Sequence, residues 1–295
     1  MKVLVTGSKG QLGFDVINEL TKRQHTAIGV DIEEMDITDN ASVRQVISGQ
    51  RPDAVIHCAA WTAVDAAEDP ENVEKVRLVN AEGTKNIANV CGELGIKMMY
   101  ISTDYVFDGA GTTPWQPDCT DYKPLNVYGQ TKLLGEQAVT AALSNYFIVR
   151  IAWVFGKNGS NFIKTMLRIG KNHDTITVVN DQIGTPTYTY DLALLLVDMI
   201  ETDKYGFYHA TNSGGYISWY DFATEIFAQA AALGHTDYDA AHLTVRPVTT
   251  AEYGISKAAR PFNSRLNQSK LVENGFKPLP HWKDALQRYL EEIDF

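Results

Sequence analysis

Cysteine is scarce in this chain of 295 residues, which has only Cys58, Cys91 and Cys119. No two of them have the CxxC spacing and their number is odd, so neither a disulfide framework nor a cysteine zinc site is expected. Cys58 and Cys91 lie among apolar residues, which predicts that both belong to the core. Few, unpaired cysteines are typical of a reducing compartment, and we expect a cytoplasmic protein.

Basic residues are also under-represented: 26 Lys and Arg stand against 36 Asp and Glu, a formal net charge of −10. An acidic surface repels phosphate backbones, which argues against a nucleic-acid partner. No apolar run approaches the roughly 18–20 residues of a membrane span, so we expect no membrane partner.

Several catalytic signatures are missing as well. The seven histidines include no HxxxH pair, and there is no GxSxG sequence, which argues against a zinc hydrolase and against a serine hydrolase of the α/β type. We expect no metal site. His57 lies within a predicted strand and is expected to be a hydrogen-bonded core residue, and the acidic runs 33–39 and 68–71 are expected to be solvated loops.

What the sequence does contain is a regular alternation of strands and helices. The first unit comprises a β-branched strand at Lys2–Thr6, a helix at Gln11–Gln24 and a strand at Thr26–Val30. The pattern continues with strands at Ala54–Cys58, Lys97–Ser102 and Phe147–Ile151 and helices at Asn72–Leu94 and Tyr128–Leu143. Such alternation predicts an α/β fold with a Rossmann-type, doubly wound parallel sheet.

The pattern loosens after about residue 150. Helices are predicted at Phe162–Lys171, Leu192–Glu201 and Trp219–Leu233, between short strands and turns rich in Gly, Pro and Asn. We therefore expect a dinucleotide-binding domain at 1–150. Residues 151–295 are expected to form mainly a smaller C-terminal α/β substrate lobe, with some chain crossing back to the first domain.

The segment from Gly7 to Gly13 has the form GxxGxxG. Glycines allow a tight turn and a close approach of the backbone to a pyrophosphate, while a helix N-terminus offers free N–H groups to the anion. This motif follows a strand and opens a helix, which is the context that dinucleotide binding requires. The predicted contacts are Gly7, Gly10, Gln11, Leu12 and Gly13.

Asp31 ends the second strand, where an acid accepts hydrogen bonds from the adenosine ribose. Its charge disfavours a 2′-phosphate, and Lys9 is the only nearby cation, so the residues favour NADH and tolerate NADPH. Asp36 follows shortly after and could border the adenine or be a solvated loop acid.

Tyr128 and Lys132 are one helical turn apart, so their side chains share a face. A phenol has a pKa near 10, and we expect the Lys132 ammonium to lower the pKa of Tyr128 toward the range useful in proton transfer. Ser102 and Thr103 end a predicted strand at the sheet edge where ligands bind, and a hydroxyl there could contact the same substrate oxygen. Together these residues predict a hydride-transfer site.

Five further segments carry a family resemblance: CAAWTAVDAAE from Cys58, STDYVFD from Ser102, RIAWVFG from Arg150, VNDQIGTPT from Val179 and RPFNSRL from Arg260. With the glycine motif and the Tyr–Lys pair, the chain resembles the dTDP-4-dehydrorhamnose reductase family of the extended short-chain dehydrogenase/reductase superfamily. The resemblance extends from the first strand nearly to the C-terminus.

The resemblance implies reduction of the C4 ketone of dTDP-4-dehydro-L-rhamnose to dTDP-L-rhamnose, the last step of dTDP-rhamnose biosynthesis for surface polysaccharides, with NADPH or NADH. By position, it implies that Tyr128 is the proton donor, that Lys132 holds the nicotinamide ribose, and that Thr103, in place of the usual serine, orients the substrate. Asp104 and Trp153 match positions that border the deoxysugar. Positions implied to contact the cofactor are Gly10, Gln11, Leu12, Asp31, Ala60, Trp61 and Thr62.

Three residues are candidates for the substrate's nucleotide. The planar fork of Arg260 could bind the diphosphate, although a surface salt bridge is an equal alternative. Asn161 and Phe162 open a predicted helix and could meet the base, or form an ordinary first helical turn.

The chain also departs from the family pattern. Trp61 stands where many members have His, so the pocket near the nicotinamide could differ in shape. Some members dimerise through a metal held by carboxylates; Asp15 could supply the first, but Tyr190 falls about where the second is expected. We therefore expect a monomer or a weak homodimer.

Two other functions stay open. A sugar-nucleotide epimerase or dehydratase would share the architecture, but a dehydratase needs an added acid/base pair, and the neighbours here are Asp104 and Tyr105. A non-catalytic regulatory subunit of the same fold would show degenerate catalytic positions, whereas Thr103, Tyr128 and Lys132 are all present.

Overall fold

A six-stranded parallel sheet organises the structure, a computed structural model that describes all 295 residues. The strand order is β10-β5-β4-β3-β1-β2. These strands are β1 (Lys2–Thr6), β2 (Thr26–Val30), β3 (Ala54–His57), β4 (Lys97–Thr103), β5 (Tyr146–Ile151) and β10 (Gly206–His209). The predicted α/β fold with a doubly wound parallel sheet is confirmed.

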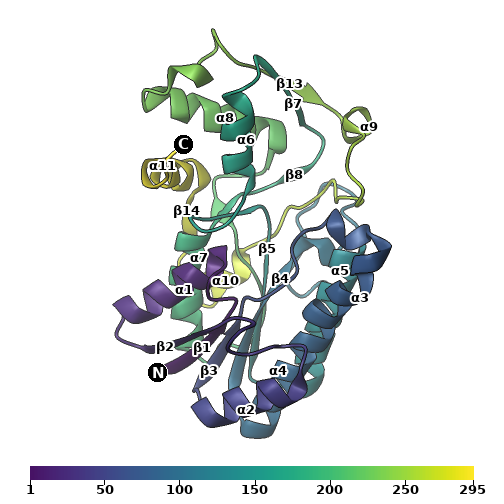
Figure 1. The fold of residues 1–295 in the computed structure, drawn as a ribbon, viewed down its shortest axis with the longest axis vertical. Coiled ribbons are helices and arrows are strands. Elements are labelled where there is room, and N and C mark those ends of the chain that lie inside the picture. The colour runs from purple at the N-terminus through teal and green to yellow at the C-terminus, as the bar shows by residue number, and fades with distance from the viewer.

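Helices cover both faces of this sheet (Figure 1). The helices of the chain are α1 (Gln11–Lys22), α2 (Asn40–Gln50), α3 (Pro70–Arg77), α4 (Thr84–Leu94), α5 (Val127–Ala142), α6 (Phe162–Gly170), α7 (Thr189–Ile200), α8 (Trp219–Ala232), α9 (Thr250–Tyr253), α10 (Ser269–Glu273) and α11 (Trp282–Glu292). One core joins the sheet to α1 and α7, and a second joins it to α2, α4 and α5.

The alternation of side chains along β1 shows why the sheet is buried on both sides. Val3 and Val5 point into the core beneath α1 and α7, whereas Leu4 points into the core beneath α2 and α4. All three are fully buried. A continuous run of apolar residues is the pattern expected of a parallel strand that is covered on both faces.

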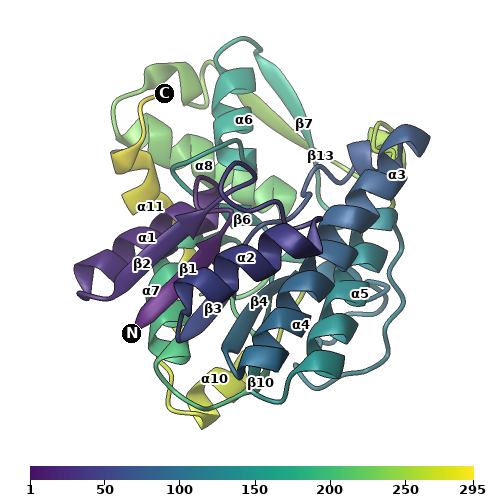
Figure 2. The ribbon, with the colours of Figure 1, turned by 60° about the horizontal axis from the view of Figure 1, so that its bottom comes forward.

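A third core lies outside the sheet, among α6, α8 and α11. Short strands accompany these helices: β6 (Val154–Phe155) with β9 (Thr187–Tyr188), β7 (Thr175–Val179) with β13 (Thr244–Val248), β8 (Ile183–Gly184) with β12 (Ile217–Ser218), and β11 (Asn212–Ser213) with β14 (Leu279–His281). Figure 2 shows α6, α8, β7 and β13 beyond the edge of the sheet.

The second half of the chain also returns to the sheet. β10 pairs with β5, and α7 and α10 pack in the core of the sheet. The division at residue 150 therefore stays a prediction, because elements beyond that residue belong both to the sheet and to the third core. No helix is both long enough and apolar enough to cross a bilayer.

Some predicted elements needed correction. The predicted helix Asn72–Leu94 is α3 and α4 joined by a π-helical stretch at Leu78–Gly83, and it starts two residues earlier, at Pro70. Helix α2 was not predicted. His57 is buried and hydrogen-bonds to Thr6 and Thr84, so the core histidine is confirmed.

Candidate active site

The glycine turn after β1 requires glycine at two of its positions. Gly7 has φ +66°, and a Cβ there would lie 2.8 Å from the backbone nitrogen of Ala59. A Cβ on Gly13 would collide with the carbonyl oxygen of Gly7. Gly10 caps α1, and no side chain occupies the amides at this helix start. Free amides at a helix N-terminus, approached by bare backbone, suit a pyrophosphate.

A large cavity of about 780 Å³ begins at this turn and extends across the carboxyl ends of the strands. Most of the predicted site residues line it: Gly7, Gly10, Gln11, Leu12, Asp31, Asp36, Ala60, Thr62, Thr103, Asp104, Tyr128, Lys132 and Trp153. The sheet therefore brings together residues that lie up to about 150 positions apart in the sequence. Gly13, Trp61, Asn161 and Arg260 lie outside its lining.

Asp31 lies directly beside the glycine turn. Its Oδ2 atom accepts hydrogen bonds from the Ser8 hydroxyl (2.6 Å) and the Lys9 amide (3.0 Å). The Lys9 ammonium is turned to Glu33 at 2.9 Å. The one basic side chain of the turn is therefore paired with an acid, and the acidic residues Asp31, Glu33 and Asp36 outnumber it in the cavity lining.

Tyr128 lies in the first turn of α5, whose start is fixed by Asn126. The Asn126 side chain accepts a hydrogen bond from the Gly129 amide (2.8 Å), and the Tyr128 ring packs edge-on against Tyr105. Burial raises the pKa of Tyr128 to about 12, because desolvation outweighs the hydrogen bond to Thr103 that lowers it. The phenol is thus fully protonated at neutral pH.

Lys132 is buried one turn further along α5. Its Nζ atom donates to the Ile101 carbonyl oxygen (2.7 Å) and lies 4.1 Å from the centre of the Tyr100 ring. Burial lowers the pKa of Lys132 to about 7, partly offset by the Glu136 carboxylate. The expectation that Lys132 lowers the pKa of Tyr128 is therefore not met, because desolvation governs both groups in this cavity.

Thr103 ends β4, and Asp104 follows it. The Thr103 hydroxyl donates to Asp104 Oδ1 (3.0 Å), whereas Asp104 Oδ2 has no hydrogen-bond partner although the side chain is buried. Burial raises the pKa of Asp104 to about 6. A buried, unpaired carboxylate oxygen is costly, so this atom is a strong acceptor for a ligand hydroxyl.

Trp153 adopts an unusual backbone conformation, with φ +52°. A left-handed conformation costs about 1–2 kcal/mol for a residue with a Cβ. The indole edge passes over Gly184, where a Cβ would lie 2.8 Å from Trp153 Cε2 and 3.1 Å from Ser264. Gly184 and Ser264 belong to the VNDQIGTPT and RPFNSRL segments, so these two segments converge on Trp153.

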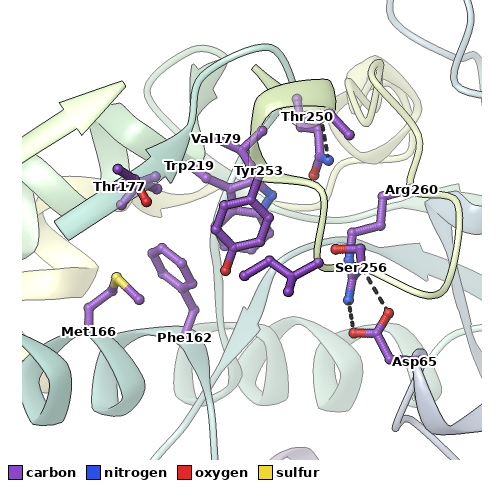
Figure 3. Close-up of a pocket in the computed structure, with 13 residues that line it drawn as sticks. Asp65, Phe162, Met166, Thr177, Val179, Trp219, Thr250, Tyr253, Ser256 and Arg260 are labelled. Atoms are coloured by element: carbon purple, nitrogen blue, oxygen red, sulfur yellow. Dashed lines mark hydrogen bonds and ion pairs between the residues drawn. The ribbon is translucent and has the colours of Figure 1, made fainter. Parts of the chain in front are cut away.

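A small cavity of about 360 Å³ is lined by Asp65 and by residues of the second half of the chain (Figure 3). Its lining includes Phe162, Met166, Gln182, Trp219, Tyr253 and Arg260. Arg260 forms two hydrogen bonds with Asp65, at 2.7 and 3.1 Å. This is the salt bridge given as the alternative from the sequence, and a contact of Arg260 with the diphosphate stays a prediction.

Asn161 and Trp61 lie outside both cavities. The Asn161 side-chain oxygen accepts from the Lys164 amide at the start of α6, and its NH2 group lies within hydrogen-bonding distance of Gln11, Gly156 and Tyr289, so its polar atoms are occupied by the chain itself. The Trp61 amide is held by Asn80, and its indole donates to Ala63. A ligand contact by either side chain stays a prediction.

Sequence reasoning missed several lining residues. Trp219, Tyr253 and Gln182 line the small cavity, and Tyr105 and Cys58 line the large one. Gln182 belongs to the VNDQIGTPT segment, which was a usable signal. Cys58 was expected in the core; it is partly buried and packs against the core of the sheet. Desolvation raises the pKa of its thiol to about 12, which excludes a reactive thiolate at neutral pH.

The acidic groups do not gather into a metal site. No group of three or more His, Cys, Asp or Glu side chains is arranged to hold a metal ion. Asp15 accepts a hydrogen bond from Thr189 at 2.5 Å, and Tyr190 is exposed. Glu68 was expected in a solvated loop, but it accepts a hydrogen bond from the Val127 amide (2.8 Å) and so helps to hold the start of α5.

Comparison with known proteins decides the family. The model of the RmlD substrate binding domain matches residues 1–295. The chain belongs to this family. It is 40% identical to a dTDP-4-dehydrorhamnose reductase of Streptomyces griseus, over 96% of this chain and 91% of that protein. It is 38% identical to the spore coat polysaccharide biosynthesis protein SpsK of Bacillus subtilis, over 99% and 97%.

A solved structure agrees. The dTDP-4-dehydrorhamnose reductase of Bacillus anthracis in complex with NADP superimposes with a TM-score of 0.91 at 40% identity, covering 99% of this chain and 100% of that one. The resemblance stated from the sequence is confirmed.

Proposed function

We propose that this protein reduces the C4 ketone of dTDP-4-dehydro-L-rhamnose to dTDP-L-rhamnose, with NADPH or NADH as reductant. The observation that carries the proposal is the convergence of Thr103, Asp104, Tyr128 and Lys132 on one cavity that begins at a glycine turn, in a chain of the RmlD family. The reaction completes a precursor for surface polysaccharides and takes place in the cytoplasm.

The residues of the large cavity have separate roles in binding the cofactor and in the reaction. The glycine turn and the first amides of α1 hold the pyrophosphate, and Asp31 accepts from the ribose. The reduced nicotinamide supplies a hydride to C4. Tyr128 is protonated at neutral pH, because burial raises its pKa to about 12, and donates its proton to the developing C4 oxyanion. Thr103 positions that oxygen, and Lys132 reaches the nicotinamide ribose.

The substrate extends from the large cavity into the small one. The deoxysugar lies between Asp104 and Trp153, where the unpaired Oδ2 of Asp104 accepts from a sugar hydroxyl. We place the nucleoside diphosphate in the small cavity, because its lining includes aromatic side chains suited to stacking on the base and Arg260, which is suited to the diphosphate. We expect the active unit to be a monomer or a weak homodimer, because Tyr190 stands about where a second carboxylate would be needed for an interface metal.

Turnover with product analysis tests the proposal. Purified protein is incubated with freshly generated dTDP-4-dehydro-L-rhamnose and either NADPH or NADH, and the sugar product is identified by NMR. We expect one equivalent of reduced dinucleotide to be consumed for each dTDP-L-rhamnose formed. An epimerised or dehydrated product with no net consumption would instead assign an epimerase or dehydratase, and no turnover at all would favour a regulatory subunit.

A further inference from the structure

Two tryptophans stack face to face at the boundary between the cavities. The rings of Trp153 and Trp219 are 3.7 Å apart between centroids, with their planes 15° apart. Trp153 lines the large cavity and Trp219 lines the small one. Each indole therefore faces a different ligand subsite, and the two are in direct contact.

Trp153 can be displaced only at the expense of several contacts. Its carbonyl oxygen accepts a hydrogen bond from the Thr187 amide (3.1 Å), and its edge rests on Gly184. Its φ of +52° is a strained conformation, which persists only where the surroundings hold it. The face-to-face contact with Trp219 is one of these restraints.

Trp219 is itself firmly placed. It is the first residue of α8 and lies between Ser218 and Asp221, which form the capping box of this helix. Its ring also packs on Phe162, with centroids 4.5 Å apart. Figure 3 shows Trp219 and Phe162 beside Tyr253 in the lining of the small cavity. A ligand that packs on these rings therefore touches the residue that holds Trp153.

We propose that Trp219 is a positioning residue, which couples occupation of the small cavity to the placement of Trp153 against the sugar. The nucleotide end of the substrate does not react, but its binding energy can be used to orient the part that does. The stacked indoles provide a direct mechanical connection between the two ends. This inference rests on the proposed function, since it assigns the small cavity to the nucleotide.

Steady-state kinetics of three variants test the coupling. Trp219→Ala removes the stack, and Trp219→Phe keeps a flat ring against Trp153. Ile226→Val is the control, because Ile226 is buried on the same helix and lines neither cavity. We expect Trp219→Ala to lower kcat roughly 10- to 100-fold and to weaken inhibition by dTDP, Trp219→Phe to recover most of kcat, and Ile226→Val to keep the wild-type kcat.

A purely structural role for Trp219 predicts another result. Stability would fall, while the folded enzyme would keep its kcat; that outcome overturns the inference. A defect confined to KM and to dTDP inhibition would also overturn it, since Trp219 would then bind the nucleotide without placing Trp153.

Circular dichroism supplies a readout that needs no turnover. Closely stacked indoles give an exciton signal in the far ultraviolet, which we expect to disappear in Trp219→Phe and in Trp153→Phe. Adding dTDP to the wild type should change its amplitude, and an unchanged signal with dTDP bound would contradict the coupling. A wild type that binds dTDP with this change but does not reduce dTDP-4-dehydro-L-rhamnose would contradict the proposed function alone.

Discussion

The Nζ atom of Lys132 donates a 2.7 Å hydrogen bond to the carbonyl oxygen of Ile101, on the strand that ends at Thr103. This bond fixes α5 against β4, so the distance between the Tyr128 helix and the Thr103 strand end depends on Lys132. An ammonium has three donors, and the remaining two are available to a ribose. Lys132 therefore fixes the position of α5 relative to β4 and also supplies hydrogen-bond donors to the site.

The pH dependence of kcat/KM follows from the buried lysine. Because burial lowers the pKa of Lys132 to about 7, it loses its proton as the pH rises through 7 in the free enzyme. We expect kcat/KM to fall above that pH. In Lys132→Arg, where the guanidinium stays protonated, absolute activity is lower but the fall near pH 7 disappears. An identical profile in both proteins would exclude Lys132 as the titrating group.

Asp104 should control the change of kcat/KM at acidic pH. Its pKa is raised to about 6 by burial, so its carboxylate forms as the pH rises through 6, and only then are both oxygens acceptors. We expect kcat/KM for the nucleotide sugar to rise over this interval in the wild type. In Asp104→Asn the rise is absent and KM is higher by roughly 10-fold, the loss of one charged hydrogen bond. A variant with the wild-type KM would show that Asp104 does not contact the sugar.

Cofactor preference tests Asp31. Its carboxylate suits the ribose hydroxyls of NADH and repels the 2′-phosphate of NADPH. Replacement by Ser removes the charge, and we expect the ratio of kcat/KM for NADPH to that for NADH to rise by roughly 10-fold or more. The ratio is measured with saturating nucleotide sugar for both proteins. No change in the ratio would mean that Asp31 does not face the adenosine ribose.

His57 contributes to stability in a pH-dependent way. Burial lowers its pKa to about 3, so it is neutral in the folded chain, whereas an unfolded histidine binds a proton below about 6.5. The contribution of His57 to the free energy of unfolding is therefore complete above about pH 6.5 and is lost as the pH falls below that value. Between pH 7.5 and 5.5 the loss from one such histidine is about 1.4 kcal/mol. In urea unfolding, His57→Asn should show a pH dependence smaller by about this amount; an equal dependence would contradict the assignment.

The central sheet could be predicted because its signals are local. The strands β1, β3, β4 and β5 are continuous apolar runs, and the glycine turn is fixed by short-range sterics at Gly7 and Gly13. Helix α2 was missed because only Val43 and Ile47 are buried along it, too few for a clear apolar stripe. The strand β10 could not be placed, since its partner β5 lies about 60 residues earlier in the chain.

Part of the candidate site could likewise be predicted from the sequence, and part could not. Tyr128 and Lys132 share a helix face and Thr103 ends a strand, so their meeting follows from the topology. The small cavity joins residues from Asp65 to Arg260, and no local pattern reveals such a contact. The pKa of Tyr128 was also misjudged, because charge can be read from the sequence whereas desolvation depends on the packed structure.

The most direct test of the account is the rate of ketone reduction in Tyr128→Phe. With dTDP-4-dehydro-L-rhamnose and saturating NADPH, we expect kcat to fall by about 10²- to 10⁴-fold, the usual loss when a general acid is removed, while NADPH binding stays at the wild-type level. The substitution removes one oxygen and leaves the ring packed against Tyr105. A variant that binds NADPH normally and turns over at the wild-type rate would show that the proton comes from another group.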